Sequence, residues 1–159
     1  MIRLIGVMLA LACSWFGGQP PVGTDAALVS FEYSHSGTSV DQIYSYAVRT
    51  EDGRLLADFD LYCGLHDIRG VPLDEEDAAA LRALIDECGL WSWSGFSGSS
   101  AYVLDGERFS LSAGFEDGAR LTASGSNAFP EGYQAGAAAI RAYFEGLMEK
   151  YGVPATPDD

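Results

Sequence analysis

YSYAVRTEDGRLLADFDL, residues 44–61, has the apolar alternation of two β-strands joined by a turn. Its Asp52-Gly53 dipeptide is typical of a two-residue type I′ turn. A loop one residue longer would cross the two faces, because a shift of one residue turns every side chain over. The two-residue turn instead places apolar residues opposite one another, in the pairs Val48–Ala57, Tyr46–Phe59 and Tyr44–Leu61. The stretch therefore predicts a tight hairpin with one buried face.

Two further segments extend the predicted sheet. Residues 28–34 alternate apolar and polar side chains and predict a half-buried strand before the hairpin. A second hairpin follows near residues 109–123, where a three-residue loop, Glu116-Asp117-Gly118, aligns the apolar faces. Gly118 is then expected in the left-handed region as a bulge residue.

Two amphipathic helices are expected after the first and second hairpins. Asp74 is placed to cap the first helix, whose apolar residues recur at three- and four-residue steps up to Cys88. The last helix has a longer stripe, and Ser126 and Asn127 are predicted to cap it, with Pro130 near its first turn. The members of the long stripe are Tyr133, Ala137, Ile140, Phe144, Leu147 and Tyr151.

These elements predict an α+β fold. The expected order is β-β-β-α-β-β-α, with about five strands in a largely antiparallel sheet and two helices packed on one face. Residues 27–153 form a single domain of ordinary size. Residues 13–26 are rich in glycine and proline and predict a tether, while residues 154–159 predict a flexible acidic tail.

Residues 1–12 have the layout of a secretory signal peptide. Arg3 precedes an apolar run that ends in Ala10-Leu11-Ala12, and a cysteine follows directly. This order predicts a lipoprotein signal in which Cys13 is lipidated and becomes the new N-terminus. Cleavage after Ala12 by an ordinary signal peptidase, or a buried N-terminal strand, are the alternatives. The expected location is extracytoplasmic and membrane-anchored, at the cell surface or in the periplasm.

The charge of the chain restricts its partners. The 159 residues carry a formal net charge of −14, and cleavage before Cys13 removes only the positive Arg3. A negative field of this size repels phosphate backbones and anionic headgroups. We therefore expect no nucleic acid partner, and expect any membrane attachment to come from the N-terminal lipid anchor.

The cysteine count fits the lipoprotein interpretation. Of three cysteines, Cys13 is assigned to the lipid, which leaves Cys63 and Cys88 as an even pair in an oxidising compartment. A disulfide between Cys63 and Cys88 is one interpretation. Two separate buried thiols are the other, since a free cysteine packs like a small apolar residue.

Three segments carry a resemblance to a known group. They read W91-S-W-S-G-F96, L104-D-G-E-R-F-S-L-S-A-G-F-E-D-G118 and S124-G-S-N-A-F-P-E-G-Y133. They resemble a group of small, uncharacterised bacterial exported proteins, often lipoproteins, whose most specific motif is S-G-S-N-x-F-P-x-x-Y. The resemblance implies an exported domain and implies no activity or catalytic residue.

Candidate binding residues lie in two loops. Trp91 and Trp93 have two interpretations. They form an aromatic platform for a glycan or peptide, or they are buried and close the core. Ser126 and Asn127 predict either a small-anion site at a helix start or simple helix capping. The histidines, His35 and His66, lack metal-ligand spacing, so we expect no metal and no cofactor.

No catalytic constellation is visible in the sequence. It has no Ser/His/Asp order, no phosphate-binding loop and no dinucleotide fingerprint. The favoured interpretation is a monomeric, non-catalytic envelope lipoprotein that binds an envelope protein, peptide or glycan. One alternative is an extracytoplasmic hydrolase or other enzyme whose site is assembled from residues distant in the sequence, for example acids around His66. Another is an inhibitor-like module that presents its acidic surface to a basic partner.

Overall fold

The computed structural model describes residues 23–100 and 106–154. The predicted signal peptide, Cys13 and most of the predicted tether and tail lie outside these residues. The strands are β1 (Leu28–Ser36), β2 (Tyr44–Glu51), β3 (Arg54–Leu61), β4 (His66–Pro72), β5 (Ser97–Ser99), β6 (Arg108–Phe115) and β7 (Arg120–Ser126). The α-helices are α1 (Glu75–Glu87) and α2 (Tyr133–Tyr151), and the short 3-10 helices are η2 (Val40–Gln42) and η3 (Leu90–Trp93).

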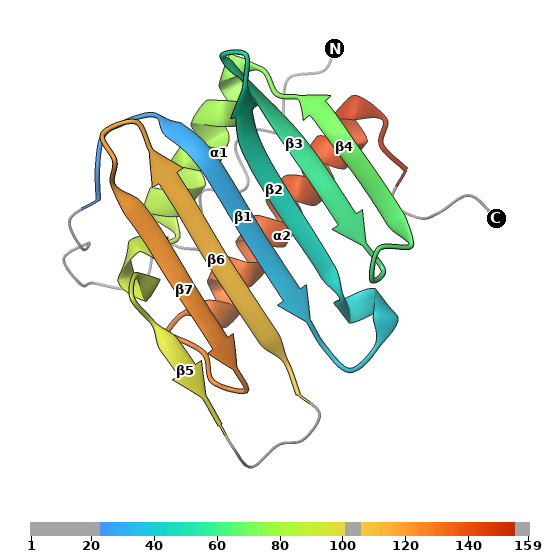
Figure 1. Ribbon diagram of the computed structural model, residues 1–159, viewed down its shortest axis with the longest axis vertical. Helices are drawn as coiled ribbons and strands as arrows, with labels where there is room; N and C mark the ends of the chain where they lie inside the picture. The colour runs from blue at the N-terminus through green and yellow to red at the C-terminus, as the bar shows by residue number, and fades with distance from the viewer. Residues whose placement is uncertain (1–22, 101–105, 155–159) are drawn as a thin grey trace.

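The fold is α+β, as expected, but its sheet is larger than predicted. Within the described residues, seven strands form one mixed sheet in the order β4-β3-β2-β1-β6-β7-β5 (Figure 1). The predicted number of about five strands and the order β-β-β-α-β-β-α were wrong because they missed β4 and β5, whereas all the described strand pairings except that of β5 with β7 are antiparallel. A bulge interrupts β4 beside a left-handed Gly70, and three-residue β5 is parallel to β7. Both are edge strands, and each is defined by its pairing with a neighbouring strand. The apolar periodicity of a sequence does not reveal such pairing.

The predicted hairpin registers are confirmed. Strands β2 and β3 pair Val48 with Ala57 and Tyr44 with Leu61, and Asp52 and Gly53 have φ angles of 51° and 76°, as a type I′ turn requires. Strands β6 and β7 are joined by the predicted three-residue loop, with Gly118 at φ 84°.

Helix α1 begins where its sequence predicts. The Asp74 carboxylate accepts a hydrogen bond from the Asp77 backbone N–H, and the Asp77 side chain accepts one from the Asp74 N–H, forming a capping box. Leu81, Leu84 and Ile85 form its buried face, as the periodicity indicated.

Helix α2 does not start as predicted. Gly132, in the left-handed conformation, occupies the N-cap position without a side-chain cap. Ser126 instead ends strand β7, and Asn127 follows it at φ 52°. The capping prediction for Ser126 and Asn127 was therefore wrong, because the strand takes up residues that look like cap residues. At the other end, Gly152 closes α2, and Val153 donates to the Met148 carbonyl.

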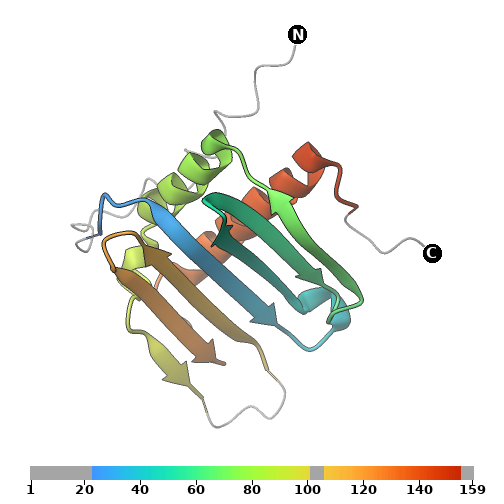
Figure 2. The ribbon, with the colours of Figure 1, turned by 45° about the horizontal axis from the view of Figure 1, so that its top comes forward.

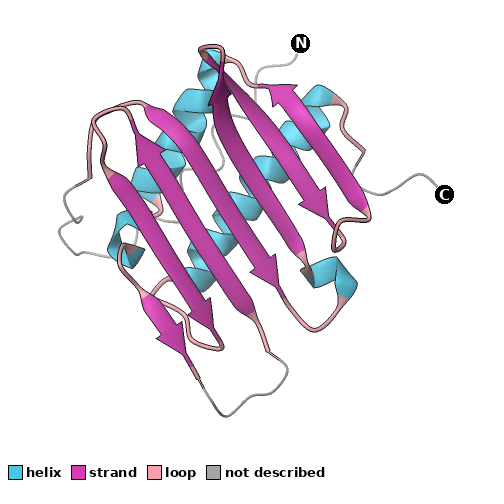
Figure 3. Cartoon of the chain, viewed as in Figure 1, coloured by secondary structure: helices cyan, strands magenta, loops and turns pink. Residues whose placement is uncertain are grey.

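Both described α-helices cover the same face of the sheet (Figures 1 and 2). The core lies between them and the strands, with Phe144 of α2 fully buried at its centre. The opposite face remains uncovered by the described helices (Figure 3).

This uncovered face is polar. A row of serines crosses five neighbouring strands in register, and Ser34 and Ser110 hydrogen bond through their hydroxyls at 2.7 Å. Small hydroxyl side chains allow an antiparallel sheet to face water on one side. The row consists of Ser45, Ser34, Ser110, Ser124 and Ser97.

An ion-pair network joins the start of α1 to the end of α2. Lys150, the one lysine of the chain, donates to Asp74 and to Asp77, both at 2.7 Å. The Tyr151 hydroxyl also donates to Asp77, whose side chain is buried. The hydrogen bond from Lys150 is the main cause that lowers the pKa of Asp74 to about 2. The network fixes the two helices relative to each other.

A close helix approach explains one glycine of α2. A Cβ atom at Gly136 would lie 2.5 Å from Trp93 Cζ2 and 3.0 Å from Leu90 Cδ2. A Cβ at Gly146 would meet nothing within 4 Å. Gly136 is therefore required where α2 packs against η3, whereas Gly146 only weakens the helix.

We expect Gly136→Ala and Gly146→Ala to have opposite effects on stability. The first substitution creates an overpacked contact and lowers the free energy of unfolding by about 1–3 kcal/mol. The second raises it by up to about 1 kcal/mol through helix propensity. Urea denaturation of both variants measures the two changes. Stabilisation by both substitutions would contradict the packing of Gly136 against Trp93.

Candidate functional site

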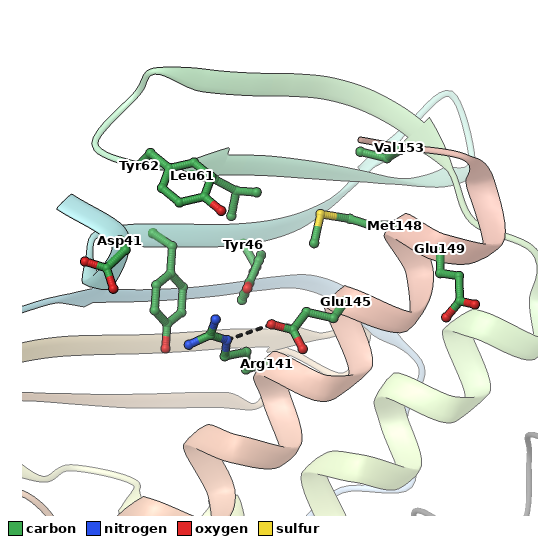
Figure 4. Close-up of a pocket in the computed structure, with 10 residues that line it drawn as sticks. Asp41, Tyr46, Leu61, Tyr62, Arg141, Glu145, Met148, Glu149 and Val153 are labelled. Atoms are coloured by element: carbon green, nitrogen blue, oxygen red, sulfur yellow. Dashed lines mark hydrogen bonds and ion pairs between the residues drawn. The ribbon is translucent and has the colours of Figure 1, made fainter. Parts of the chain in front are cut away.

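A cavity of about 310 Å³ lies between the β2–β3 hairpin and the second half of α2. Its lining comes from the hairpin, from η2, from the turn after β3, from α2 and from the segment after α2 (Figure 4). The lining residues are Asp41, Tyr44, Tyr46, Leu61, Tyr62, Arg141, Glu145, Met148, Glu149 and Val153. We call this the tyrosine cavity, because three of its described lining residues are tyrosines.

Strand alternation places two of these tyrosines. Tyr44 and Tyr46 lie on the helix-facing side of β2, with ring centroids 5.3 Å apart. Tyr46 stacks on Phe144 at 4.5 Å with an interplanar angle of only 5°. Phe144 is fully buried, so this stacking gives the cavity a rigid floor. Tyr62 reaches the cavity from the turn after β3, where its φ angle is 54°.

The helix contributes an ion pair to the cavity. Arg141 Nε donates to Glu145 Oε1 at 2.7 Å, one turn apart on α2 (Figure 4). The guanidinium carbon of Arg141 also lies 5.4 Å from the centroid of the Tyr44 ring, in cation–π geometry. The hydrogen bond to Glu145 raises the pKa of Arg141. The cavity thus combines an aromatic floor with a charged rim.

Two further buried tyrosines lie behind the aromatic floor of the cavity. Tyr33 and Tyr133 hydrogen bond through their hydroxyls at 3.0 Å. Desolvation by burial is the main cause that raises the pKa of both groups, to about 12 for Tyr133 and beyond that for Tyr33. Burial raises the pKa of Tyr44 and Tyr46 as well. At neutral pH these hydroxyls are uncharged hydrogen-bonding groups.

The two tryptophans do not form a binding platform. Trp91 is 9% exposed and Trp93 is 1% exposed, so the predicted platform was wrong and the core interpretation is confirmed. Their indole N–H groups are used internally, by Asp86 Oδ1 at 3.1 Å and by the Glu131 carbonyl at 3.2 Å. The 3-10 helix η3 turns both rings inward, whereas the prediction assumed a loose loop.

Ser126 and Asn127 lie away from the tyrosine cavity. Ser126 pairs with Arg108 on β6 and with Ser99 on β5, and the Asn127 backbone N–H donates to the Glu107 carbonyl at 2.8 Å. Because α2 begins only after Gly132, neither residue stands at its first turn. The predicted anion site at a helix start is therefore not formed by these residues.

Cys63 and Cys88 form no disulfide in the described structure. Cys63 is exposed in the turn between β3 and β4, at φ 60°, next to one edge of the sheet. Cys88 is partly buried at the end of α1, which continues into η3 beside β7 near the other edge. The predicted bridge assumed that strand alternation reaches Cys63, but β3 ends at Leu61 and turns away.

The histidines and Asp58 are held by other protein groups. The described residues contain no group of three His, Cys, Asp or Glu side chains suited to a metal ion. His35 Nδ1 is 3.0 Å from the Gln42 carbonyl, and His66 Nε2 is 2.6 Å from the Pro154 carbonyl. Asp58, on the uncovered side of β3, is buried. It accepts hydrogen bonds from Arg49 Nε at 3.0 Å and from the Gly70 N–H at 2.7 Å.

The amino-acid sequence predicted no ligand site at the residues of the tyrosine cavity. It placed Tyr44, Tyr46 and Leu61 on a buried face, and the Arg141–Glu145 spacing is a recognisable helical ion pair. What it could not supply was the meeting of α2 with the open end of the hairpin. Tyr62 comes from a turn and Asp41 from the short helix η2, and the position of both depends on the whole fold.

The chain matches no known family model and no curated protein. Among the described residues, neither α-helix combines the length and the apolar character that crossing a membrane requires.

We expect the fold to be lost in alkali together with cooperative ionisation of buried tyrosines. Burial raises the pKa of Tyr133 to about 12, above its ordinary value near 10. Stability is then complete below the ordinary pKa and falls as the pH rises from there towards 12, because only the unfolded chain ionises readily. Tyrosinate absorption and circular dichroism, recorded together, measure the transition. Ionisation of all tyrosines near their ordinary pKa without unfolding would contradict this burial.

Proposed function

We propose that this protein is an exported, lipid-anchored domain of the bacterial cell envelope that binds a small molecule in the tyrosine cavity without transforming it. The observation that carries the binding function is the cavity itself, whose volume of about 310 Å³ suits a compact ligand. Its mixture of aromatic, aliphatic and charged lining resembles that of ligand sites in general.

The lining favours binding over catalysis. The described lining residues include no histidine, cysteine, serine or threonine, so they offer no nucleophile–base pair of the usual kind. Burial raises the pKa of Tyr44 and Tyr46 further from neutrality, which makes them poor proton-transfer groups. The carboxyl groups of Asp74 and Asp117, whose pKa is lowered, lie outside the cavity.

The N-terminal sequence supports export and anchoring. Residues 1–12 have a basic start, an apolar run and a small-residue end, and Cys13 follows. The strongly negative chain has little attraction for anionic lipid headgroups, so a lipid on Cys13 accounts best for membrane attachment. The polar outer face of the sheet is compatible with a monomer.

We expect Cys13→Ser to release the protein from membranes when it is expressed in a bacterium. The substitution removes the thiol that carries the lipid, while Cys63→Ser serves as a control because Cys63 is an exposed residue of the folded domain. Membrane fractionation and incorporation of labelled fatty acid measure the outcome. Unchanged fractionation and labelling of the Cys13→Ser variant would exclude lipidation at this residue.

We expect the purified chain to bind at least one compound of a small panel: agmatine, benzoate and benzyl alcohol. Chemical-shift changes should appear at Tyr46, Tyr62 and Met148, which line the cavity. Val153→Trp fills the cavity entrance and should abolish these changes. Val29→Trp, at an exposed residue of β1 outside the cavity lining, should leave them intact. Absence of binding for the whole panel, or binding unaffected by Val153→Trp, would contradict the proposed site.

A further inference from the structure

The tyrosine cavity carries an excess of negative charge. Of its described lining residues, three bear carboxylates, Asp41, Glu145 and Glu149, and one bears a guanidinium, Arg141. The whole chain adds a field of the same sign, with a net charge of −14. Such a field raises the local concentration of cations and lowers that of anions.

The cavity already holds a cation on an aromatic face. The Arg141 guanidinium lies 5.4 Å from the centre of the Tyr44 ring and 2.7 Å from a Glu145 oxygen. An aromatic face combined with a carboxylate is the arrangement that recognises ammonium and guanidinium groups. Arg141 shows that this part of the cavity accommodates such a group.

An apolar surface adjoins this cation position. Tyr46, Leu61 and Met148 are all buried and form the floor of the cavity. Figure 4 shows Met148 extending from α2 towards the strands that carry Tyr46 and Leu61. A ligand with a short apolar body therefore finds a surface to cover beside its charged group.

We propose that the ligand of the tyrosine cavity is a small organic cation, an ammonium or guanidinium compound with a short apolar body. It takes the position of the Arg141 guanidinium against Tyr44 and Glu145. This inference rests on the proposed function for the existence of the site and names the chemical class that the site selects.

Displacement of Arg141 has a low cost. The side chains of Arg141 and Glu145 are 53% and 50% exposed, and exposed helical ion pairs contribute little to stability. The Arg141 side chain can move into water while its backbone stays in α2. An anionic ligand would have to approach the carboxylates of Asp41, Glu145 and Glu149 to reach Arg141, and their charge opposes its binding.

The test is a titration of the purified full chain with agmatine, tetramethylammonium, benzoate and benzyl alcohol, followed by chemical shifts. We expect the two cations to bind at Tyr44, Tyr62 and Met148, and benzoate not to bind. Glu145→Gln should weaken cation binding about two- to fivefold, since it removes the pairing carboxylate. Added salt should weaken binding as well.

Arg141→Met distinguishes this proposal from its alternatives. Because Arg141 competes with the ligand, its removal should tighten agmatine binding about two- to fivefold. Arg108→Met changes the net charge equally at a site outside the cavity and should have no such effect. Glu116→Gln is the matching control for Glu145→Gln, because Glu116 is exposed in the β6–β7 loop.

Three outcomes would overturn the inference. Benzoate binding that Arg141→Met abolishes would identify an anion site. Binding of benzyl alcohol alone would identify an apolar site. Agmatine binding that responds to salt, but to neither Glu145→Gln nor Arg141→Met, would place the cation on the general acidic surface. The first two results leave the proposed binding function intact, whereas absence of all binding removes both.

Discussion

The packing of Phe144 is the contact on which the rest of the structure depends. Its ring stacks on Tyr46 at 4.5 Å and on Phe31 at 5.9 Å, and it meets the edge of Phe59 at 6.0 Å. These partners come from β2, β1 and β3, so one side chain ties α2 to the middle of the sheet. Gly136 and Gly146 weaken α2 from within, and this burial supplies the tertiary packing that the helix needs. The Lys150 network then sets the position of α1 against the end of α2.

The tyrosine cavity follows from this arrangement. On either side of Phe144 in the chain, Arg141 and Glu145 of α2 line the cavity, and these charged groups stay at the surface instead of filling the core. The result is a recess with a rigid aromatic floor and a movable charged rim. A rigid floor favours affinity, because little conformational freedom is lost on binding, and a movable rim permits a ligand to replace the Arg141 guanidinium. Both proposals about function depend on that combination.

The apolar alternation and the turn dipeptides were sufficient to predict the two hairpins, since one buried face permits only one register. Helix α1 was predictable for a similar reason, because Asp74 begins it and a continuous apolar stripe follows. The predictions that failed concern Trp91, Ser126 and Cys63. Each belongs to a segment whose local pattern is compatible with several conformations. The burial of Trp91, the extended path at Ser126 and the turn at Cys63 depend on contacts with segments distant in the sequence.

The amino-acid order was thus enough to establish an α+β class, the pairing within each hairpin, and the acidic character of the chain. The proposed location rests on the export signal predicted for residues 1–12. The folded chain alone revealed the edge strands β4 and β5, the internal use of both tryptophans, and the cavity. The physical reason is that period and turn chemistry are local properties. A cavity, in contrast, exists only where β2, β3, η2 and α2 meet, and the distance between those elements in the chain hides their contact in space.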